Sequence, residues 1–337
     1  LSSSSAASDV YKRQVPMKRN ISPLHDLIAF IRIFIILIKV RPHIVHARTP
    51  KGGMLGTVAA IVARVPIRIY HIYGLRFTTM KGWRRNIVYL AEKFTSFCAT
   101  NIYSCVSTKI CLEFKLCPEK KLTNSLNGSV NGVNTIEKFN PEKLHSERKT
   151  IRKDNNISEN AIVVGFVGRI VKDKGFIELV EAWDILRNKL SNIHLLVVGP
   201  YESEDPIKSE VKRVLESDSR IHLMGLVLDP TSYYSAMDIY VLPSYREGFP
   251  TTILEAAAMR LPVVATRIPG CMEAMVDGET GTLVDARNVV HLADALLSYC
   301  ENEDLRINHG NNGRDRVLSD FQPEAIWEFM LEEYNTL

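Results

Sequence analysis

Two carboxylates lie eight residues apart in the stretch from Ile239 to Val264. Glu247 follows the apolar run Ile239 to Leu242, which has β character, and Glu255 lies in a helical stretch rich in Ala and Leu. Eight helical residues span about 12 Å, whereas the paired carboxylates of glycosidases lie roughly 5 to 9.5 Å apart. The spacing therefore favours two contacts to one extended ligand, although two ordinary surface glutamates on a buried helix would also fit it.

A second pair of chemically useful residues, Arg169 and Lys174, follows the apolar run Ile162 to Val167 in the passage GRIVKDKGF. A guanidinium group offers a planar fork to phosphate oxygens, and an ammonium group is a mobile point charge. The turn between them leads into a helix that we expect over Phe176 to Leu190. The alternative is that both cations are simply solvated after a strand.

The elements around Glu247 are those of a parallel sheet with helical crossovers. The loop 243–249 follows the first strand, a helix is expected over Thr251 to Met259, and a second strand over Pro262 to Ala265. Pro250 suits the first helical position, where its missing N–H costs nothing. The residue before a proline disfavours α geometry, so Pro262 ends the helix.

Ligands of such sheets lie off the carboxyl ends of the strands, near helix N-termini. The free N–H groups at a helix N-terminus favour anions. We therefore expect the N–H groups of Phe249, Thr251 and Thr252 to point at an anionic part of the ligand.

The wording EGFPTTILE, with its Glu-x7-Glu spacing, resembles the signature of the retaining nucleotide-sugar glycosyltransferases of family 4, which have the GT-B fold. GRIVKDKGF resembles the GR-x4-KG motif of the same family. The resemblance implies that Glu247 contacts the donor sugar, that Glu255 holds the nucleotide ribose, and that Arg169 and Lys174 grip the donor diphosphate. Glu247, Arg169 and Lys174 are thus the expected catalytic residues.

The remaining donor-binding residues follow from the same resemblance. RIPGCMEAMVDG is similar to the Pro-Gly and Gly-x-x-Glu turn of the family, matched here by Pro269, Gly270 and Glu273. The resemblance implies a donor site that contains Gly168, Gly248, Phe249, Thr251, Thr252, Glu255 and Glu273.

The fold implied is α/β of the GT-B class, with two Rossmann-like domains facing a cleft. We expect a foreign or disordered tail over residues 1–14, an acceptor-side domain over 15–150, a nucleotide-sugar domain over 151–320, and a C-terminal helix over 321–337 that crosses back to the first domain. GT-B chains normally open with a strand and a Gly-rich loop, and LSSSSAASDVYKRQ stands in that place. The first domain is therefore expected to be incomplete and the chain truncated.

Composition limits the class of protein. A length of 337 residues suggests about two domains. The six cysteines have no zinc-binding spacing, so buried reduced thiols and a cytoplasmic location are expected. GxGxxG is absent, which argues against a nicotinamide dehydrogenase. No D-x-D occurs, so neither a metal nor another cofactor is indicated, and the two cations can take the role of a metal on the diphosphate.

The first 150 residues carry 24 Lys and Arg against 8 Asp and Glu, a net charge of +16. Such an excess suggests an anionic partner: a phospholipid surface, a polyprenyl diphosphate or nucleic acid. No nucleic-acid motif is present, so nucleic acid is not expected. The alternative is a solvated basic surface. The segment GWRRN combines a Trp with cations, as is seen at membrane interfaces.

Three residues of the first half are candidates for the acceptor side. VHARTPKGG is similar to the matching loop of bacterial surface-polysaccharide members of the family, which act on lipid-diphosphate-linked sugars, and this implies a phosphate contact for Lys51. Many members carry a His before the glycine at position 74. Tyr73 holds that place here, and His71 lies two residues earlier, on the same face of an expected strand.

The periodicity of the remaining sequence predicts further elements. Helices are expected over Ser22–Val40, Arg85–Phe97, Thr108–Phe114, Pro206–Leu215, Tyr233–Met237, Val289–Tyr299, Leu305–Ser319 and Trp327–Tyr334, and strands over His43–His46, Ile67–Ile72, Ile102–Val106, His194–Val198 and Ile221–Met224.

The function implied is retaining transfer of a sugar from a nucleotide diphosphate sugar, with UDP the expected nucleotide, to a polyprenyl-diphosphate-linked saccharide in cell-surface polysaccharide synthesis. The enzyme would act in the cytoplasm, peripheral on the inner, anionic face of the plasma membrane. Two alternatives stay open: another GT-B enzyme such as a nucleotide-sugar epimerase, and a non-catalytic nucleotide-binding protein.

Overall fold

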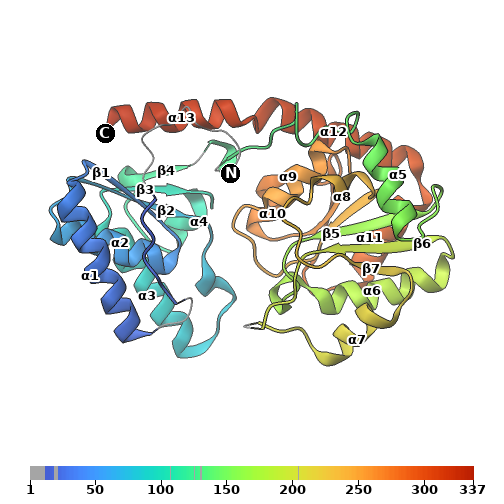
Figure 1. The fold of residues 1–337 in the computed structure, drawn as a ribbon, viewed down its shortest axis with the longest axis horizontal. Coiled ribbons are helices and arrows are strands. Elements are labelled where there is room, and N and C mark those ends of the chain that lie inside the picture. Colours follow the sequence, from blue (N-terminus) through green and yellow to red (C-terminus); the bar gives the residue numbers. More distant parts are fainter. Residues whose placement is uncertain (1–11, 19–21, 107, 125, 130, 204) are drawn as a thin grey trace. The chain divides into compact units, whose positions relative to one another are not determined.

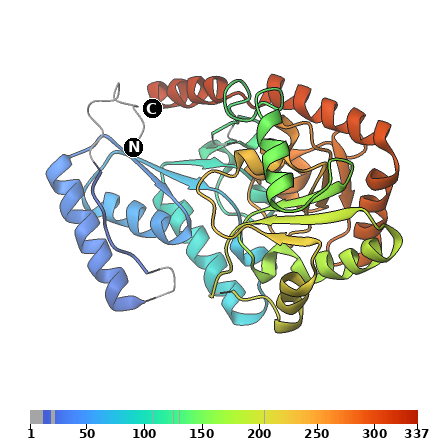
Figure 2. The ribbon, with the colours of Figure 1, turned by 45° about the vertical axis from the view of Figure 1, so that its right-hand side comes forward.

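The computed structural model describes residues 12–18, 22–106, 108–124, 126–129, 131–203 and 205–337. Within these ranges the chain forms two compact units, each built on its own β-sheet with helices beside it (Figures 1 and 2). The first unit comprises the described residues up to Ile72, together with Asn86–Tyr103 and Leu112–Thr123. The second comprises Tyr73–Arg85, the described part of 104–111, and the described residues from Asn124 onward.

The first unit contains a four-stranded sheet with the order β1-β2-β3-β4. Its strands are β1 (Ile44–Arg48), β2 (Ile67–Ile72), β3 (Asn101–Ser104) and β4 (Leu122–Asn124), and its helices are α1 (Pro23–Val40), α2 (Pro50–Val62) and most of α3 (Gly82–Cys98). β1 and β2 run parallel, and α2 packs against both strands and against α1.

The second unit contains a six-stranded parallel sheet with the order β10-β9-β8-β5-β6-β7. Its strands are β5 (Ile162–Val167), β6 (Ile193–Val198), β7 (Ile221–Leu223), β8 (Ile239–Leu242), β9 (Val263–Thr266) and β10 (Gly281–Val284). The central strands are buried over nearly their whole lengths, as expected for a sheet that is covered on both faces.

Helices cover this sheet in two layers. After α3 the chain forms ten further α-helices within the described residues: α4 (Thr108–Glu113), α5 (His145–Asp154), α6 (Phe176–Lys189), α7 (Ser209–Ser217), α8 (Thr231–Ser235), α9 (Thr251–Ala258), α10 (Pro269–Ala274), α11 (Val289–Glu301), α12 (Glu303–Asp320) and α13 (Pro323–Thr336). α6 packs against α7 and α11, whereas α9 packs against α10 and α12. The core between the layers includes the buried Trp183, Phe166, Phe176 and Tyr240.

The strand order places a topological switch point between β5 and β8. From β5 the chain moves outward through β6 to β7, and it then returns to β8 and moves the other way through β9 to β10. The loops after β5 and after β8 therefore leave the sheet side by side and diverge. Ligands of doubly wound sheets bind at such a point.

Most elements expected from the sequence are present within a few residues of their predicted bounds, and several features differ. Pro250 is the N-cap residue of α9, because its backbone is extended (φ −78°, ψ 96°), and the first helical residue is Thr251. The segment around Pro269, expected as a turn, forms the short helix α10. The polar run before Asn160, for which no element was predicted, contains α5.

α5 is held against the sheet by the side chain of a buried arginine. The side chain of Arg152 is fully buried and donates to Asp238 Oδ2 over 2.7 Å and to the carbonyl oxygens of Ala236 and Ala161. Arg148 donates to Asp238 Oδ1 over 2.8 Å. α5 thus belongs to the second unit, and a domain boundary at 150/151 would lie within it. The four-part division expected from the sequence stays a prediction, and residues 1–11 of the expected tail lie outside the described residues.

All six cysteines are free thiols. Cys98, Cys105, Cys111 and Cys271 are buried, and Cys117 and Cys300 are partly buried. Among the helices that the structure describes, none has both the length and the apolar character needed to cross a bilayer.

Candidate functional site

The loops after β5 and β8 contact each other directly at the switch point. The N–H of Tyr245 donates to the carbonyl oxygen of Asp173 over 2.8 Å, and the Arg246 guanidinium lies 2.8 Å from the Asp173 carboxylate. Gly175 has a left-handed backbone (φ 72°), and a Cβ there would lie 2.0 Å from the carbonyl oxygen of Pro243. Only glycine allows this approach, so the turn before α6 is held against the loop before α9.

The contact joins two of the three predicted catalytic residues. Lys174 Nζ lies 2.6 Å from Glu247 Oε1, and the two side chains are only 18% and 12% exposed. β5 and η4 (Lys172–Lys174) position the lysine, and the loop after β8 positions the glutamate. A cation expected to hold phosphate and a carboxylate expected to hold sugar thus neutralise each other.

Arg169, the third predicted catalytic residue, is paired in the same way. Its Nη1 lies 2.5 Å from Glu202 Oε2, and its side chain is 45% exposed. Glu202 follows β6, which pairs with β5 in the sheet. Sequence reasoning did not single out Glu202, although the adjacency of β5 and β6 in a doubly wound sheet brings the two loops together.

Glu255 is partly buried in α9 and contacts a residue that sequence reasoning missed. Tyr234 of α8 donates its hydroxyl hydrogen to Glu255 Oε2 over 2.7 Å. Burial raises the pKa of Glu255, and the hydrogen bond from Tyr234 opposes that rise. Tyr234 is itself fully buried, so the carboxylate position is fixed by the core rather than by solvent.

The start of α9 offers N–H groups to the same region. The first N–H groups of an α-helix have no acceptor within the helix, which applies to Thr251 and Thr252 here. The ring centroids of Phe249 and Phe321 are 5.8 Å apart. Gly168 is the first residue after β5. The structure thus gathers Gly168, Phe249, Thr251 and Thr252 at the carboxyl ends of β5 and β8.

Two polar atoms of the loop after β8 are buried without a hydrogen-bond partner among the described residues: Ser244 Oγ and Arg246 Nε. Orphaned buried polar atoms are uncommon in folded proteins. A bound polar ligand or an ordered water would satisfy them, which is consistent with a ligand site at this loop.

Gly248 lies where three backbone segments meet. A Cβ on Gly248 would lie 1.7 Å from the carbonyl oxygen of Tyr73, and a Cβ on Gly270 would lie 2.0 Å from the carbonyl oxygen of Gly248. Gly74 is also close, since a Cβ there would lie 2.9 Å from Gly248 Cα. The loop that carries Glu247 is therefore packed backbone to backbone on both sides.

Glu273, the last predicted donor-binding residue, lies in α10, the helix that begins one residue before Gly270. Its carbonyl oxygen accepts a hydrogen bond of 2.9 Å from Arg316, and its side chain is half-buried. A ligand contact for Glu273 stays a prediction.

The acceptor-side candidates have different surroundings. Lys51 is paired with Asp26 of α1 at 2.8 Å in the first unit. His71 is buried in β2, stacked on His46 with ring centroids 5.2 Å apart, and burial lowers its pKa to about 3. Tyr73 lies just beyond β2 and is grouped with the second unit. Their roles stay predictions, and the low pKa makes His71 a neutral imidazole at pH 7.

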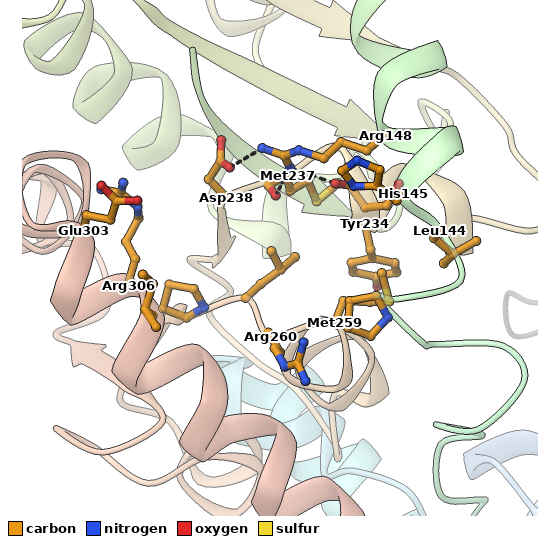
Figure 3. Close-up of a pocket in the computed structure, with 15 residues that line it drawn as sticks. Leu144, His145, Arg148, Tyr234, Met237, Asp238, Met259, Arg260, Glu303 and Arg306 are labelled. Carbon is orange, nitrogen blue, oxygen red and sulfur yellow. Dashed lines mark hydrogen bonds and ion pairs between the residues drawn. The ribbon is translucent and has the colours of Figure 1, made fainter. Parts of the chain in front are cut away.

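A pocket of about 300 Å³ lies elsewhere in the second unit, between α5, α8 and α12 (Figure 3). Arg148 points at Asp238 across one wall, and Arg260 is paired with Glu142 at 2.7 Å. Among the described lining residues, Tyr234 is one that contacts a predicted site residue. Its ring lines the pocket, and its hydroxyl donates a hydrogen bond to Glu255. The predicted site residues do not line this pocket.

Among the described residues, no group of three or more His, Cys, Asp and Glu side chains is placed to hold a metal ion.

Known proteins with similar sequences point in the same direction as the geometry. The family model for the group 1 glycosyl transferases matches residues 147–316. The capsular polysaccharide biosynthesis glycosyltransferase CapM of Staphylococcus aureus is 38% identical over 327 residues, or 96% of this chain and 84% of that protein. A UDP-Gal:alpha-D-GlcNAc-diphosphoundecaprenol alpha-1,3-galactosyltransferase of Escherichia coli is 28% identical over 90% of this chain and 78% of its own length.

Solved structures show the same fold. HepE of Anabaena, crystallised in complex with UDP, superposes with a TM-score of 0.76 at 19% identity, covering 94% of this chain and 85% of its own. The sucrose-phosphate synthase of Thermosynechococcus elongatus superposes with a TM-score of 0.77 at 21% identity, covering 96% and 82%. These matches confirm the α/β GT-B fold expected from the sequence.

Proposed function

The chain belongs to the group 1 glycosyltransferases, and from that premise we propose that it transfers a sugar, with retention, from a UDP-sugar to a polyprenyl-diphosphate-linked saccharide. One observation carries the assignment to this site. The loops after β5 and β8 meet at the switch point of the second sheet, where Lys174 and Glu247 lie 2.6 Å apart. That is where a doubly wound sheet holds a nucleotide.

The relatives support the substrate class. The CapM of S. aureus is named for capsular polysaccharide biosynthesis, and the E. coli relative is named for a UDP-sugar donor and a diphosphoundecaprenol acceptor. We propose the same classes of donor and acceptor for this chain. The sugar itself, and the linkage formed, are left to experiment.

The chemistry follows from the charges at the site. In sugar transfer the bond between the anomeric carbon and the donor diphosphate breaks, and a bond from that carbon to an acceptor hydroxyl oxygen forms. The hydroxyl proton passes to the departing diphosphate. Negative charge grows on the departing diphosphate. Arg169, Lys174 and the N-terminus of α9 can stabilise that charge, and electrostatic stabilisation of this kind usually contributes more to catalysis than any other effect.

The two glutamates would then act on different parts of the donor. Lys174 leaves Glu247 for the diphosphate, which frees the Glu247 carboxylate to accept hydrogen bonds from the sugar. Glu255, fixed by Tyr234 at 2.7 Å, would accept from the ribose hydroxyls. The cations take the place of a bridging metal, so we propose that transfer needs no divalent ion.

We also propose that the enzyme works in the cytoplasm, at the inner face of the plasma membrane. The net charge of +16 in the first 150 residues suits an anionic surface. A polyprenyl acceptor would itself be confined to the bilayer, so a peripheral enzyme must approach it there.

A transfer assay tests the proposal. The full chain is incubated with UDP-sugars of different kinds and with an undecaprenyl-diphosphate-linked saccharide, and UDP release is measured with and without acceptor, and with EDTA. UDP released only when acceptor is present supports the transferase. A donor converted to an isomer without acceptor would instead show an epimerase, and UDP binding without turnover of any donor would show a non-catalytic protein.

A further inference from the structure

α3 carries an apolar stripe that faces outward. The stripe consists of Trp83, Ile87, Leu90, Phe94 and Phe97, which are 68%, 48%, 60%, 51% and 78% exposed. They are spaced alternately four and three residues apart. Since successive helical residues are rotated by about 100°, all five lie within an arc of about 80°. The stripe therefore runs along the whole helix on one side.

The opposite side of α3 is polar and buried. Glu92, Thr95 and Ser96 are each 1–2% exposed. Glu92 Oε2 accepts a hydrogen bond of 2.7 Å from the hydroxyl of Tyr70, while Glu92 Oε1 and Ser96 Oγ have no partner among the described residues. An amphipathic helix of a soluble protein normally turns its apolar stripe inward. In α3 the arrangement is inverted, and apolar patches exposed in this way mark interaction surfaces.

The exposed charges of the segment that carries the stripe have one sign. Residues 73–98 contain five cations and a single acid, Glu92, which is buried on the far side. The cations are Arg76, Lys81, Arg84, Arg85 and Lys93. By helical geometry Arg84 and Lys93 flank the stripe on its two sides. The Arg84 guanidinium lies 5.6 Å from the ring centroid of Trp83, so cation and indole share one end of the stripe.

We propose that α3 is the surface through which the protein docks onto an anionic lipid bilayer. The apolar stripe would enter the boundary between headgroups and acyl chains, with the helix lying in the plane of the surface. The flanking cations would contact lipid phosphates, and Trp83 would lie at the headgroup level, where indoles concentrate.

A second copy of the chain fits the stripe less well. The alternating spacing also suits a partner helix in a coiled coil, but such seams are normally flanked by charges of both signs. Two α3 helices would bring only cations together at their edges, and like charges at short range repel. The charge pattern complements lipid phosphates rather than another α3.

This inference rests on the proposed membrane association, and it names the surface responsible. Vesicle co-sedimentation of the full chain tests it, with vesicles of phosphatidylglycerol and phosphatidylethanolamine compared with vesicles of phosphatidylcholine alone. The test variant is Leu90→Glu/Phe94→Glu. The matched control is Val290→Glu/Ile307→Glu in the second unit, whose wild-type side chains are 59% and 51% exposed, against 60% and 51% in α3.

The wild-type chain and the control should bind the anionic vesicles alike, and the α3 variant should bind at least about tenfold more weakly, since two apolar side chains no longer enter the lipid. Quenching of Trp83 by brominated lipid, in a Trp327→Phe background, should show the indole at the bilayer interface. Circular dichroism of each variant checks that folding is unchanged.

Three results would overturn the inference. The first is equal vesicle binding by the α3 variant and the control, and the second is equal binding of wild type to neutral and anionic vesicles. The third is a wild-type dimer in sedimentation velocity that the α3 variant no longer forms, while the variant still binds vesicles. Wild-type protein that binds no vesicles would overturn the membrane association as well. Transfer to a short-chain, water-soluble acceptor is measured in parallel, so that failure of the transferase proposal is seen separately.

Discussion

Replacing Glu247 with Gln should tighten the binding of UDP, even though it removes a residue expected to act in catalysis. Glu247 Oε1 lies 2.6 Å from Lys174 Nζ, and both side chains are largely shielded from water. A diphosphate must compete with that carboxylate for the lysine. Because UDP has no sugar for Glu247 to contact, removing the carboxylate should remove the competitor without removing a ligand contact.

The size of the effect can be bounded from the geometry. Two unit charges 2.6 Å apart attract by about 6 kcal/mol at an effective dielectric constant of 20. Desolvation offsets most of this, and exposed pairs contribute no more than about 1 kcal/mol. Because these two side chains are only 18% and 12% exposed, we expect a net interaction free energy of about 1.5 kcal/mol. Its removal corresponds to a change of roughly tenfold in the dissociation constant of UDP.

Isothermal titration of UDP into wild type, Glu247→Gln, Lys174→Met and a control provides the measurement. The control is Glu216→Gln, an exposed carboxylate 3.7 Å from Lys212, which should leave binding unchanged. Lys174→Met should weaken binding, and Glu247→Gln should strengthen it about tenfold while abolishing transfer. Unchanged or weaker UDP binding by Glu247→Gln would refute the idea that the two residues restrain each other.

Three further predictions concern residues around the site and in the core. Gly248→Ala should abolish UDP binding and lower the melting temperature, because its Cβ would lie 1.7 Å from the carbonyl oxygen of Tyr73; differential scanning fluorimetry with and without UDP measures both. Arg152→Met should lower the free energy of unfolding of the second unit by about 3–5 kcal/mol, because Asp238 loses its buried partner. Urea unfolding measures this, and an unchanged urea midpoint would contradict the role given to this pair. Burial raises the pKa of Glu92 to about 6 from an unfolded value of 4.5, so the folded state binds the proton more tightly and stability is lost as pH rises through that window. Glu92→Gln should therefore match wild type near pH 4 and exceed it by up to about 2 kcal/mol at pH 7.5, as followed by urea unfolding at the two pH values.

The second sheet and its loops could be predicted because the signals are local. The apolar runs that form β5 and β8 are bounded by glycine and proline, and the motifs after them carry their own spacing. Parallel-sheet topology then places both loops at one edge. The resemblance of these motifs to the family named Lys174 and Glu247 as contacts of one donor. The structure places the two side chains 2.6 Å apart, and their ligand contacts stay predictions.

The pairings could not be predicted, because they depend on contacts between distant parts of the chain. Nothing local shows that Glu202 would neutralise Arg169, or that Tyr234 would hold Glu255. α5 was missed for a similar reason: its sequence is polar, and it is held by Arg152 reaching into the core rather than by an apolar stripe. Tertiary contacts outweigh the local pattern in such segments.

The meeting of Gly74, Gly248 and Gly270 has a consequence for how the sequence can evolve. Each glycine lies where the backbone of another segment occupies the space that a side chain would need. A change to alanine at any one of them cannot be relieved by trimming a neighbouring side chain, because the obstacle is main chain. The three positions are separated by up to 196 residues along the chain. In a saturation library they should tolerate no substitution, singly or in combination, whereas the residues around them should accept substitutions.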